Sequence, residues 1–265
     1  MANTVYANKV IENKMADMLT TKLDMAQFFT TDYALTEAAG MVKEIHTYTA
    51  SGNVERLNQG VGNTSVIEGS FTSAPYTVQV LQGKGVYYDE EAMKDPFIVD
   101  VIMRGMVDKM VNQITTEAIT EFGEATLTQA CDFSTTSSSY VFNAIVDGIG
   151  QLNVENEEGF FILANPSAQA YLRKGLGQDL KYVEAFAKTG YIGSVVGLPL
   201  FITKAVPNST MFIANKEAVT NFIKRGVEVE QERDADTRAN RLFIRQCNVV
   251  ALTDATKVVK LAPSA

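Results

Sequence analysis

The chain has 265 residues, of which 23 are Lys or Arg and 31 are Asp or Glu, and its formal net charge is −8. This acidic balance makes the protein a poor candidate for tight nucleic-acid binding, which gains its affinity by neutralising phosphates, although the chain could still enclose nucleic acid without binding it tightly. No segment approaches the ~18 consecutive apolar residues that a membrane span needs, so we expect no membrane partner.

The first 41 residues are predicted to form an N-terminal arm. Met15, Met18, Leu19 and Leu23 fall at helical spacings, which indicates a short amphipathic helix. Two arrangements fit this pattern equally well: the helix packs on its own domain, or it reaches onto a neighbouring molecule. The arm has none of the marks of a secretion signal, so we expect the protein to stay in the cytoplasm, with both cysteines reduced.

Residues 42–90 are predicted to form a long, bent two-stranded hairpin, because the segment is rich in Val, Thr, Ser, Tyr and Gly. Its apolar residues are too scattered to make a core of their own, and isolated hairpins are marginal in water. We therefore expect this hairpin to be stabilised by a second copy or another protein. The residues predicted to contact a neighbouring subunit are Val54, Leu57, Val66, Ile67, Phe71, Val78 and Val80.

A long helix is predicted over residues 96–125, opened by an Asp95 N-cap and Pro96 at its first position. Its apolar residues recur every fourth position at Ile98, Ile102, Met106, Met110 and Ile114. A coiled coil is one alternative. A Met- and Ile-rich stripe of this length more often lies along a sheet as a spine.

The second half of the chain is predicted to be mixed α/β. After a polar link at 132–139, we expect a helix with its apolar face from Val141 to Leu152, a buried strand at Phe160–Ala164 and a short helix through Lys174. A strand to Thr203, a strand at Met211–Ala214 and a helix over 215–226 follow. The predicted elements end with an antiparallel pair around a turn at Arg233–Arg238 and a strand at Lys257–Ala262.

No catalytic, cofactor or metal site is predicted. The single histidine, His46, and two isolated cysteines, Cys131 and Cys247, cannot make a His/Cys metal set. The stretch "GVGNTS" lacks the lysine of a phosphate-binding loop, and "DADTRAN" lacks the later glycine and glutamate of a calcium loop. We therefore expect a protein that is not an enzyme and has no cofactor.

The order of these parts resembles the major capsid proteins of tailed double-stranded DNA phages, the Hong Kong 97 type. The stretches that carry the resemblance are "YYDEEAMKDP", "GFFILANPSAQAYLRK", "VVGLPLFITKAVPNSTMFIANKEAV" and "GVEVEQERDADTRANRLFIRQCNVVALTDATKVVKL". It covers nearly the whole chain, although no single motif is diagnostic.

The resemblance implies an α+β fold of the Hong Kong 97 type, in which the hairpin is called the E-loop and lies over the neighbouring subunit. It further implies a peripheral domain that contains the spine helix, and a mixed α/β axial domain at the capsomer centre. Residues 91–134 and 224–247 would form the peripheral domain, and residues 135–223 and 248–265 the axial domain.

The implied function is a structural one: self-assembly through hexamers and pentamers into an icosahedral virion shell, built in the bacterial cytoplasm. The shell would enclose DNA without sequence-specific binding, and its partners would include a separate scaffolding protein and a portal. An encapsulin-type compartment shell is an alternative, as is a soluble α/β enzyme that carries an assembly hairpin.

Overall fold

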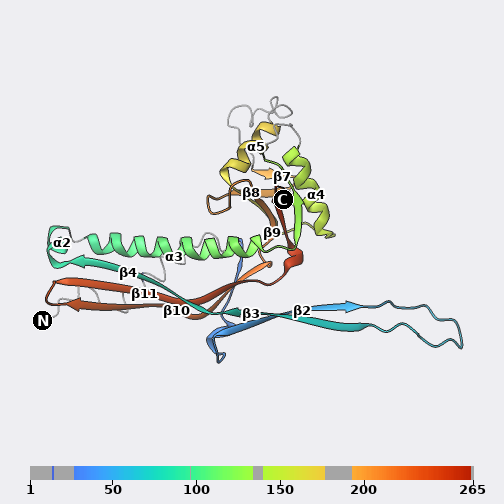
Figure 1. Ribbon diagram of the computed structural model, residues 1–265, viewed down its shortest axis with the longest axis horizontal. Coiled ribbons are helices and arrows are strands. Elements are labelled where there is room, and N and C mark those ends of the chain that lie inside the picture. The colour runs from blue at the N-terminus through green and yellow to red at the C-terminus, as the bar shows by residue number, and fades with distance from the viewer. Residues whose placement is uncertain (1–13, 15–26, 96, 134–139, 177–192, 264–265) are drawn as a thin grey trace.

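The computed structural model describes the chain in five stretches, which are residues 14, 27–95, 97–133, 140–176 and 193–263. The helix predicted around Met15 to Leu23, Pro96 and the polar link at 134–139 therefore lie outside the described residues. The described chain forms a long flat layer, an upright α/β part above it and a hairpin that extends away from both (Figure 1).

The flat layer is a four-stranded sheet whose two central strands are long. In spatial order the strands are β1 (Thr30–Asp32), β10 (Val219–Asp234), β11 (Ala239–Leu252) and β4 (Gln79–Tyr88). β10 and β11 are antiparallel, as the sequence predicts, and their pairing reaches from Val219↔Leu252 to Asp234↔Ala239. Among the described strands, β4 pairs with β11 alone, so its other side is an edge of the described sheet.

The predicted spine helix is confirmed as α3 (Ile98–Gly123), preceded by the short helix α2 (Asp89–Lys94). The predicted N-cap is wrong: Phe97, not Asp95, is the N-cap of α3, although the Asp95 carboxylate accepts a hydrogen bond of 2.9 Å from the Phe97 amide. α3 lies along β4, β10 and β11, which is the predicted spine arrangement rather than a coiled coil (Figure 1).

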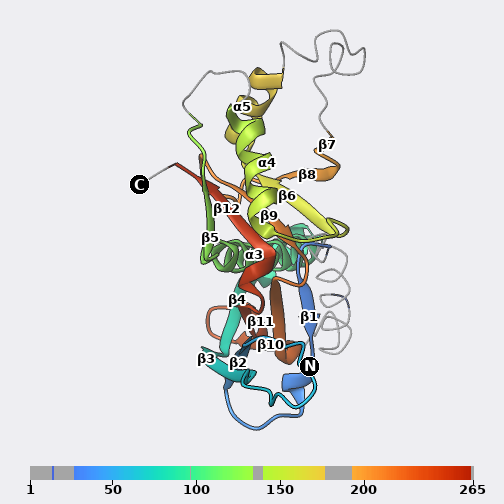
Figure 2. The same cartoon turned by 90° about the vertical axis from the view of Figure 1, so that its right-hand side faces the viewer.

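The upright part is a six-stranded mixed sheet. Its strands, in spatial order, are β5 (Leu127–Ala130), β12 (Val258–Ala262), β9 (Met211–Asn215), β6 (Phe160–Ala164), β8 (Leu198–Ile202) and β7 (Ser194–Val195). Helices α4 (Tyr140–Leu152) and α5 (Pro166–Leu176) accompany it, and α4 lies against β5, β9 and β12 (Figure 2). The predicted helix from Val141 to Leu152, the strand Phe160–Ala164 and the short helix through Lys174 are confirmed.

The spine helix belongs to the hydrophobic cores of both sheets. Its first half packs Met103, Val107 and Met110 against Leu242 and Ile244 of β11. Its second half packs in a different cluster, against the six-stranded sheet. The members of this second cluster on α3, β6 and β9 are Ile114, Ala118, Ile119, Phe122, Phe161, Leu163, Phe212 and Ala214.

The opposite face of the six-stranded sheet is covered by α4 and α5. Along β6, Phe160, Ile162 and Ala164 belong to the hydrophobic cluster under α4 and α5. Phe161 and Leu163 belong to the cluster on the side of the spine helix. All five residues of β6 are buried, which is expected for a strand with both faces covered.

The third part is a separate two-stranded hairpin of β2 (Val42–Ser51) and β3 (Glu68–Thr77), with ten register pairs from Val42↔Thr77 to Ser51↔Glu68. The predicted hairpin segment 42–90 therefore divides in two. Residues 79–88 leave the hairpin and form β4, because each of them finds a register partner on β11. The hairpin alone extends from the body (Figure 1).

Two predictions in the second half of the chain are wrong. Residues 215–226 do not form a helix, because Val219–Ile223 are all buried at the start of β10, between β1 and β11. Strand pairing on both sides overrides the helix-like spacing. The strand predicted to run to Thr203 is broken into β7 and β8 by a turn in which Val196 and Gly197 both have positive φ.

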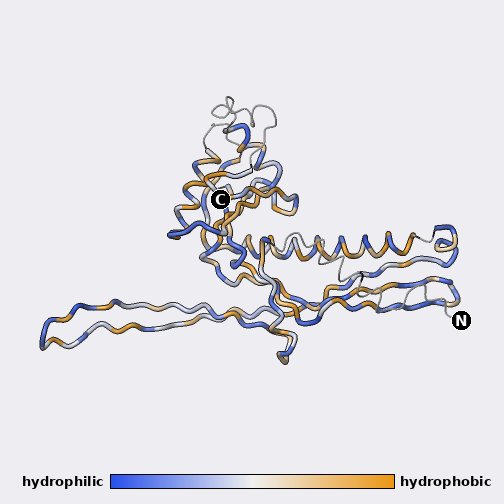
Figure 3. The backbone as a smooth tube through the Cα atoms, turned by 180° about the vertical axis from the view of Figure 1, so that it is seen from behind, coloured by the Kyte–Doolittle hydropathy of each residue, from blue (hydrophilic) through white to orange (hydrophobic). Residues whose placement is uncertain are grey.

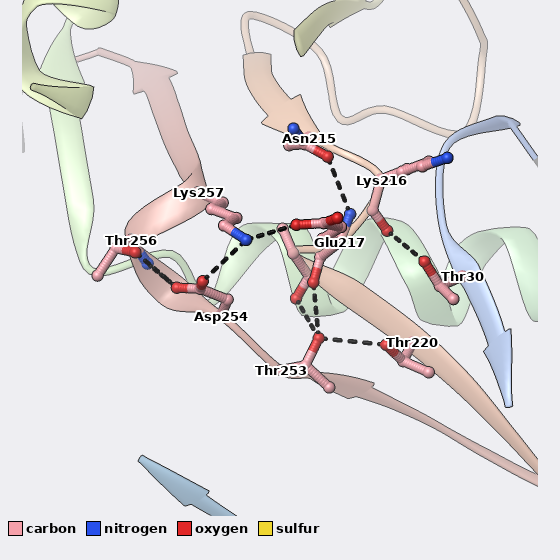
Figure 4. A network of polar contacts seen from close by, with 10 residues as sticks. Thr30, Asn215, Lys216, Glu217, Thr220, Thr253, Asp254, Thr256 and Lys257 are labelled. Carbon is pink, nitrogen blue, oxygen red and sulfur yellow. Dashed lines mark hydrogen bonds and ion pairs between the residues drawn. The ribbon is translucent and has the colours of Figure 1, made fainter. Parts of the chain in front are cut away.

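Two of the chain segments that link the sheets, the β9–β10 and β11–β12 connections, meet in a polar junction, which includes the 3₁₀ turn Ala255–Lys257 (Figure 4). Lys257 Nζ lies 2.5 Å from Glu217 Oε2 and 3.5 Å from Asp254 Oδ2. The Thr253 hydroxyl donates to the backbone carbonyl of Glu217 at 2.9 Å. These contacts tie the β9–β10 connection to the β11–β12 connection.

Gly85 sets the close approach of β4 to the spine helix. A Cβ at this position would overlap the Ile102 side chain and lie 2.8 Å from the Met106 sulfur. We expect Gly85→Ala to lower the free energy of unfolding by about 1–3 kcal/mol, because the added methyl overpacks this contact.

Gly105 supplies the matched control for Gly85. It lies on α3 with no atom near the place of an added Cβ. Gly105→Ala should therefore stabilise the protein by roughly 0.5–1 kcal/mol through helix propensity. Urea denaturation of both variants measures the two effects, and equal signs would contradict the packing argument.

Candidate assembly surfaces

The hairpin is the most exposed apolar element of the described chain. Hydrophilic and hydrophobic residues are mixed along both of its strands, without a long hydrophobic run (Figure 3). Within the described residues, its few buried contacts lie at its base, where Ile45 and Tyr76 pack beside the cluster of Leu35, Phe222 and Ala251.

The hairpin tip, residues 52–67, is held by local polar contacts rather than by strand pairing. Ser65 Oγ donates to the Asn53 carbonyl at 2.5 Å, and Thr64 donates from its hydroxyl to Glu55 at 3.3 Å. Gly52, with φ +128°, passes so close to Val66 that a Cβ would overlap the Val66 carbonyl oxygen. The two arms of the tip are therefore joined to each other where the ladder ends, although the tip itself has no strand pairing.

Five of the seven residues predicted to contact a neighbour lie on the distal hairpin and are exposed. Their exposed fractions are 87% for Val54, 45% for Leu57, 68% for Val66, 59% for Ile67 and 64% for Phe71. Tyr48, which the prediction omitted, lies beside Phe71 across the ladder, with the ring centroids 6.1 Å apart. The alternation of β2 could have indicated it.

The other two predicted residues lie on the body of the protein rather than on the distal hairpin. Val80 is 55% exposed and opens β4. Val78 is only 4% exposed and packs with Leu35, Phe222 and Ala251. The structure thus contradicts the prediction for Val78, whose side chain is used in the chain's own core.

A groove of about 480 Å³ lies where the hairpin base, β4, β11 and the spine helix meet. Its lining residues are Pro75, Tyr76, Thr77, Gln79, Val80, Leu81, Gln113, Glu117, Thr120, Glu121, Asn248, Val249 and Val250. We call it the acidic groove, because Glu117 and Glu121 are the charged residues among the described residues that line it. The sequence prediction missed this site, although Gln113, Glu117 and Glu121 share the i, i+4 spacing of one helix face.

The electrostatics of the groove centre on Glu121. Its Oε2 accepts a hydrogen bond of 3.0 Å from the Leu252 amide. Burial raises the pKa of the Glu121 carboxyl, and the nearby charges of Glu124 and Glu117 act in the same direction, whereas hydrogen bonds from Leu252 and Tyr76 oppose them. Burial also raises the pKa of Tyr76, and the Glu121 charge adds to that shift. No lysine or arginine lines the groove among the described residues, so the described chain leaves this negative charge unbalanced.

A second groove of about 560 Å³ lies farther along β4, between that strand and the first half of α3, and it shares Leu81 and Gln113 with the acidic groove. It is lined by apolar atoms of Ile102, Met106 and Met110, and it also contains Lys84 and Lys109. Its charge is therefore opposite in sign to that of the acidic groove.

Groups with chemical reactivity are sparse. Among the described residues, no cluster of three or more His, Cys, Asp or Glu side chains is arranged to hold a metal ion. Burial, assisted by the Asp132 charge, raises the pKa of the Cys131 thiol to about 11. In the described part of the chain, no helix is long and apolar enough to cross a membrane.

Comparisons with known proteins agree with this architecture. The chain is 24% identical to the major capsid protein of Staphylococcus phage phiMR11, over 97% of this chain and 95% of that protein. Its fold matches a native GTA particle capsid with a TM-score of 0.75 and 11% identity, covering 91% of this chain and 90% of that one. The chain has the Hong Kong 97-type capsid fold. No protein-family model matches it.

The same capsid fold occurs in a virus-like particle from Pyrococcus furiosus, with a TM-score of 0.66 and 10% identity over 96% of this chain and 98% of that one. A capsid fold alone therefore does not distinguish a phage virion from other shells. Within the described residues, the distal hairpin is exposed and the acidic groove lies at its base.

Proposed function

We propose that this chain is the major capsid protein of a tailed phage and self-assembles into the icosahedral shell of the virion. The observation that carries this proposal is the match to a phage major capsid protein along almost the entire length of both chains. The exposed hairpin supports it, because a strand pair with so little buried surface needs a partner.

Hexamers and pentamers would be the building units of this shell, with the distal hairpin residues of one subunit against the next. Six of the predicted contact residues remain in this proposal: Val54, Leu57, Val66, Ile67, Phe71 and Val80. A separate scaffolding protein, a portal and enclosed DNA that is not bound in a sequence-specific way belong to the same proposal. An acidic chain fits the last point, since packaged DNA would not adhere to it.

We also infer a division of the chain that follows its two sheets. The peripheral domain would consist of α3 with β4, β10 and β11, and the axial domain of the six-stranded sheet with α4 and α5. The boundaries expected from the sequence, after residues 223 and 247, fall inside β10 and β11. The polar junction of Glu217, Asp254 and Lys257 is a better place for the boundary.

We also propose that the protein is not an enzyme, which agrees with the structural role of the similar phage protein. The experiment is sedimentation with negative-stain electron microscopy of the chain, expressed with and without its neighbouring genes. We expect rings or shells, with nucleic acid inside particles made in the complete gene context. A chain that stays monomeric in every context would refute the proposal, and shells that hold only protein cargo would favour the compartment alternative.

A further inference from the structure

The acidic groove has a charge that the described chain leaves unbalanced. None of its lining residues is a Lys or Arg, and no ion pair joins Glu117 or Glu121 to a cation of the described residues. From the described residues, the Glu117 carboxylate accepts a hydrogen bond of 3.0 Å from the Gln113 side-chain amide. Beside these carboxylates lies the exposed apolar side chain of Val80. A fitting ligand would present one cation next to apolar surface.

The hairpin tip has the complementary chemistry. Arg56 is exposed between Val54 and Leu57, two exposed apolar residues. The adjacent carboxylate of Glu55 is occupied by Thr64, and no carboxylate of the described residues pairs with Arg56. The tip therefore presents a cation flanked by apolar side chains.

Arg56 cannot enter the acidic groove of its own chain. The groove lies at the hairpin base, at Pro75–Thr77, whereas Arg56 lies beyond the far end of the ten-pair ladder. At about 3.3 Å per residue, the ladder separates the two by roughly 30 Å. The hairpin is also extended, with its tip directed away from the body (Figure 1).

We propose that the acidic groove is the docking site for the hairpin tip of a second copy of this chain, with Arg56 of that copy placed between Glu117 and Glu121. Leu57 and Val54 of the incoming tip would cover Val80. This inference rests on the proposed function, since it names the partner surface of the assembly hairpin.

The geometry of this contact accounts for closed rings. The tip and the groove are different surfaces, so each subunit would insert its tip into the groove of one neighbour and receive the tip of its other neighbour in its own groove. Such a head-to-tail contact generates a ring when the rotation closes. Docking a cation would also lower the raised pKa of Glu121, because opposite charge favours the carboxylate.

The second groove is a poorer site for the tip. It contains Lys84 and Lys109, which would repel Arg56. Its apolar lining could still receive Leu57, so a test must distinguish the two grooves.

The first experiment is a charge reversal, read out as the protein concentration needed for ring or shell formation. Arg56→Glu should raise that concentration about tenfold or more, because it places like charges in the contact. Adding Glu117→Arg should restore assembly. The matched control combines Arg56→Glu with Glu155→Arg, so both double variants have the same net charge. Glu155 lies on an exposed loop outside both grooves, and this control should not restore assembly.

The second experiment is disulfide cross-linking in a Cys247→Ser background, which leaves only the buried Cys131. Leu57→Cys with Thr120→Cys, in the acidic groove, should give a ladder of covalent oligomers on a non-reducing gel. Leu57→Cys with Lys109→Cys, in the second groove, should give none.

The outcomes separate this inference from the proposed function. If wild type assembles but Arg56→Glu assembles equally well, or only the Lys109 pair cross-links, the docking site is wrong and the capsid function stands. If wild type forms no assembly in any gene context, the proposed function itself fails.

Discussion

Removing the distal hairpin is expected to abolish rings and shells while the body of the chain stays folded. The suitable variant replaces residues 48–71 with an Asn-Gly turn, which joins Thr47 to Thr72 at a register pair and favours a tight hairpin. The removed segment contains five of the six proposed contact residues and none of the buried core. Ile45 and Tyr76, which pack on the body, are kept.

The measurement is sedimentation for assembly together with urea denaturation for stability. We expect complete loss of assembly and a change of less than about 1 kcal/mol in the free energy of unfolding, because exposed residues contribute little to the folded monomer. Shells formed by the shortened chain would show that the hairpin is not the assembly element.

Phe122→Ala is expected to have the largest effect on stability. The Phe122 side chain is fully buried at the end of the spine helix, with its ring centroid 6.2 Å from that of Phe212 and 6.4 Å from that of Phe161. Its removal would leave a cavity between the helix and the six-stranded sheet. A loss of about 3–5 kcal/mol is expected for such a truncation, which is a large part of the ~5–15 kcal/mol of a typical domain.

Phe71→Ala provides the matched comparison, since it makes the same chemical change on the exposed hairpin. It should leave the urea midpoint of the monomer within the range of ordinary surface substitutions, about ±0.5 kcal/mol. It should weaken assembly instead. If the two variants lowered monomer stability equally, the assignment of one phenylalanine to the core and the other to an interface would be wrong.

The parts of the fold that the sequence predicted well are those with strong local signals. The spine helix has Asp95 before it and a repeating apolar stripe, so its extent differs from the prediction only at the ends. The β10–β11 pair was recognisable from the alternation of Val227 and Val229 with Leu242 and Ile244 around a charged turn. In both cases the pattern in the sequence matches the periodicity of the element itself.

The failures occur where a distant partner decides the structure. Residues 219–223 have a helix-like pattern, yet they form a strand because β1 and β11 flank them. Likewise, the sequence predicts residues 79–88 as part of the hairpin, whereas in the structure they pair with β11. Val78 was expected on an interface, whereas Leu35 and Ala251, far away in the chain, bury it.

By itself, the sequence determined the class of fold, the spine helix and the existence of an exposed hairpin that needs a partner. The helix and the hairpin follow from composition and local periodicity, which act over a few residues, whereas the class of fold follows from the resemblance of the order of the parts to a known family. Only the tertiary structure decided where the hairpin ends and which side chains remain exposed. It also brought Glu117 and Glu121 of the helix together with Val80 and Val249 of two strands in one groove. The physical reason is that strand pairing and burial depend on residues far apart in the chain, and no local pattern records them.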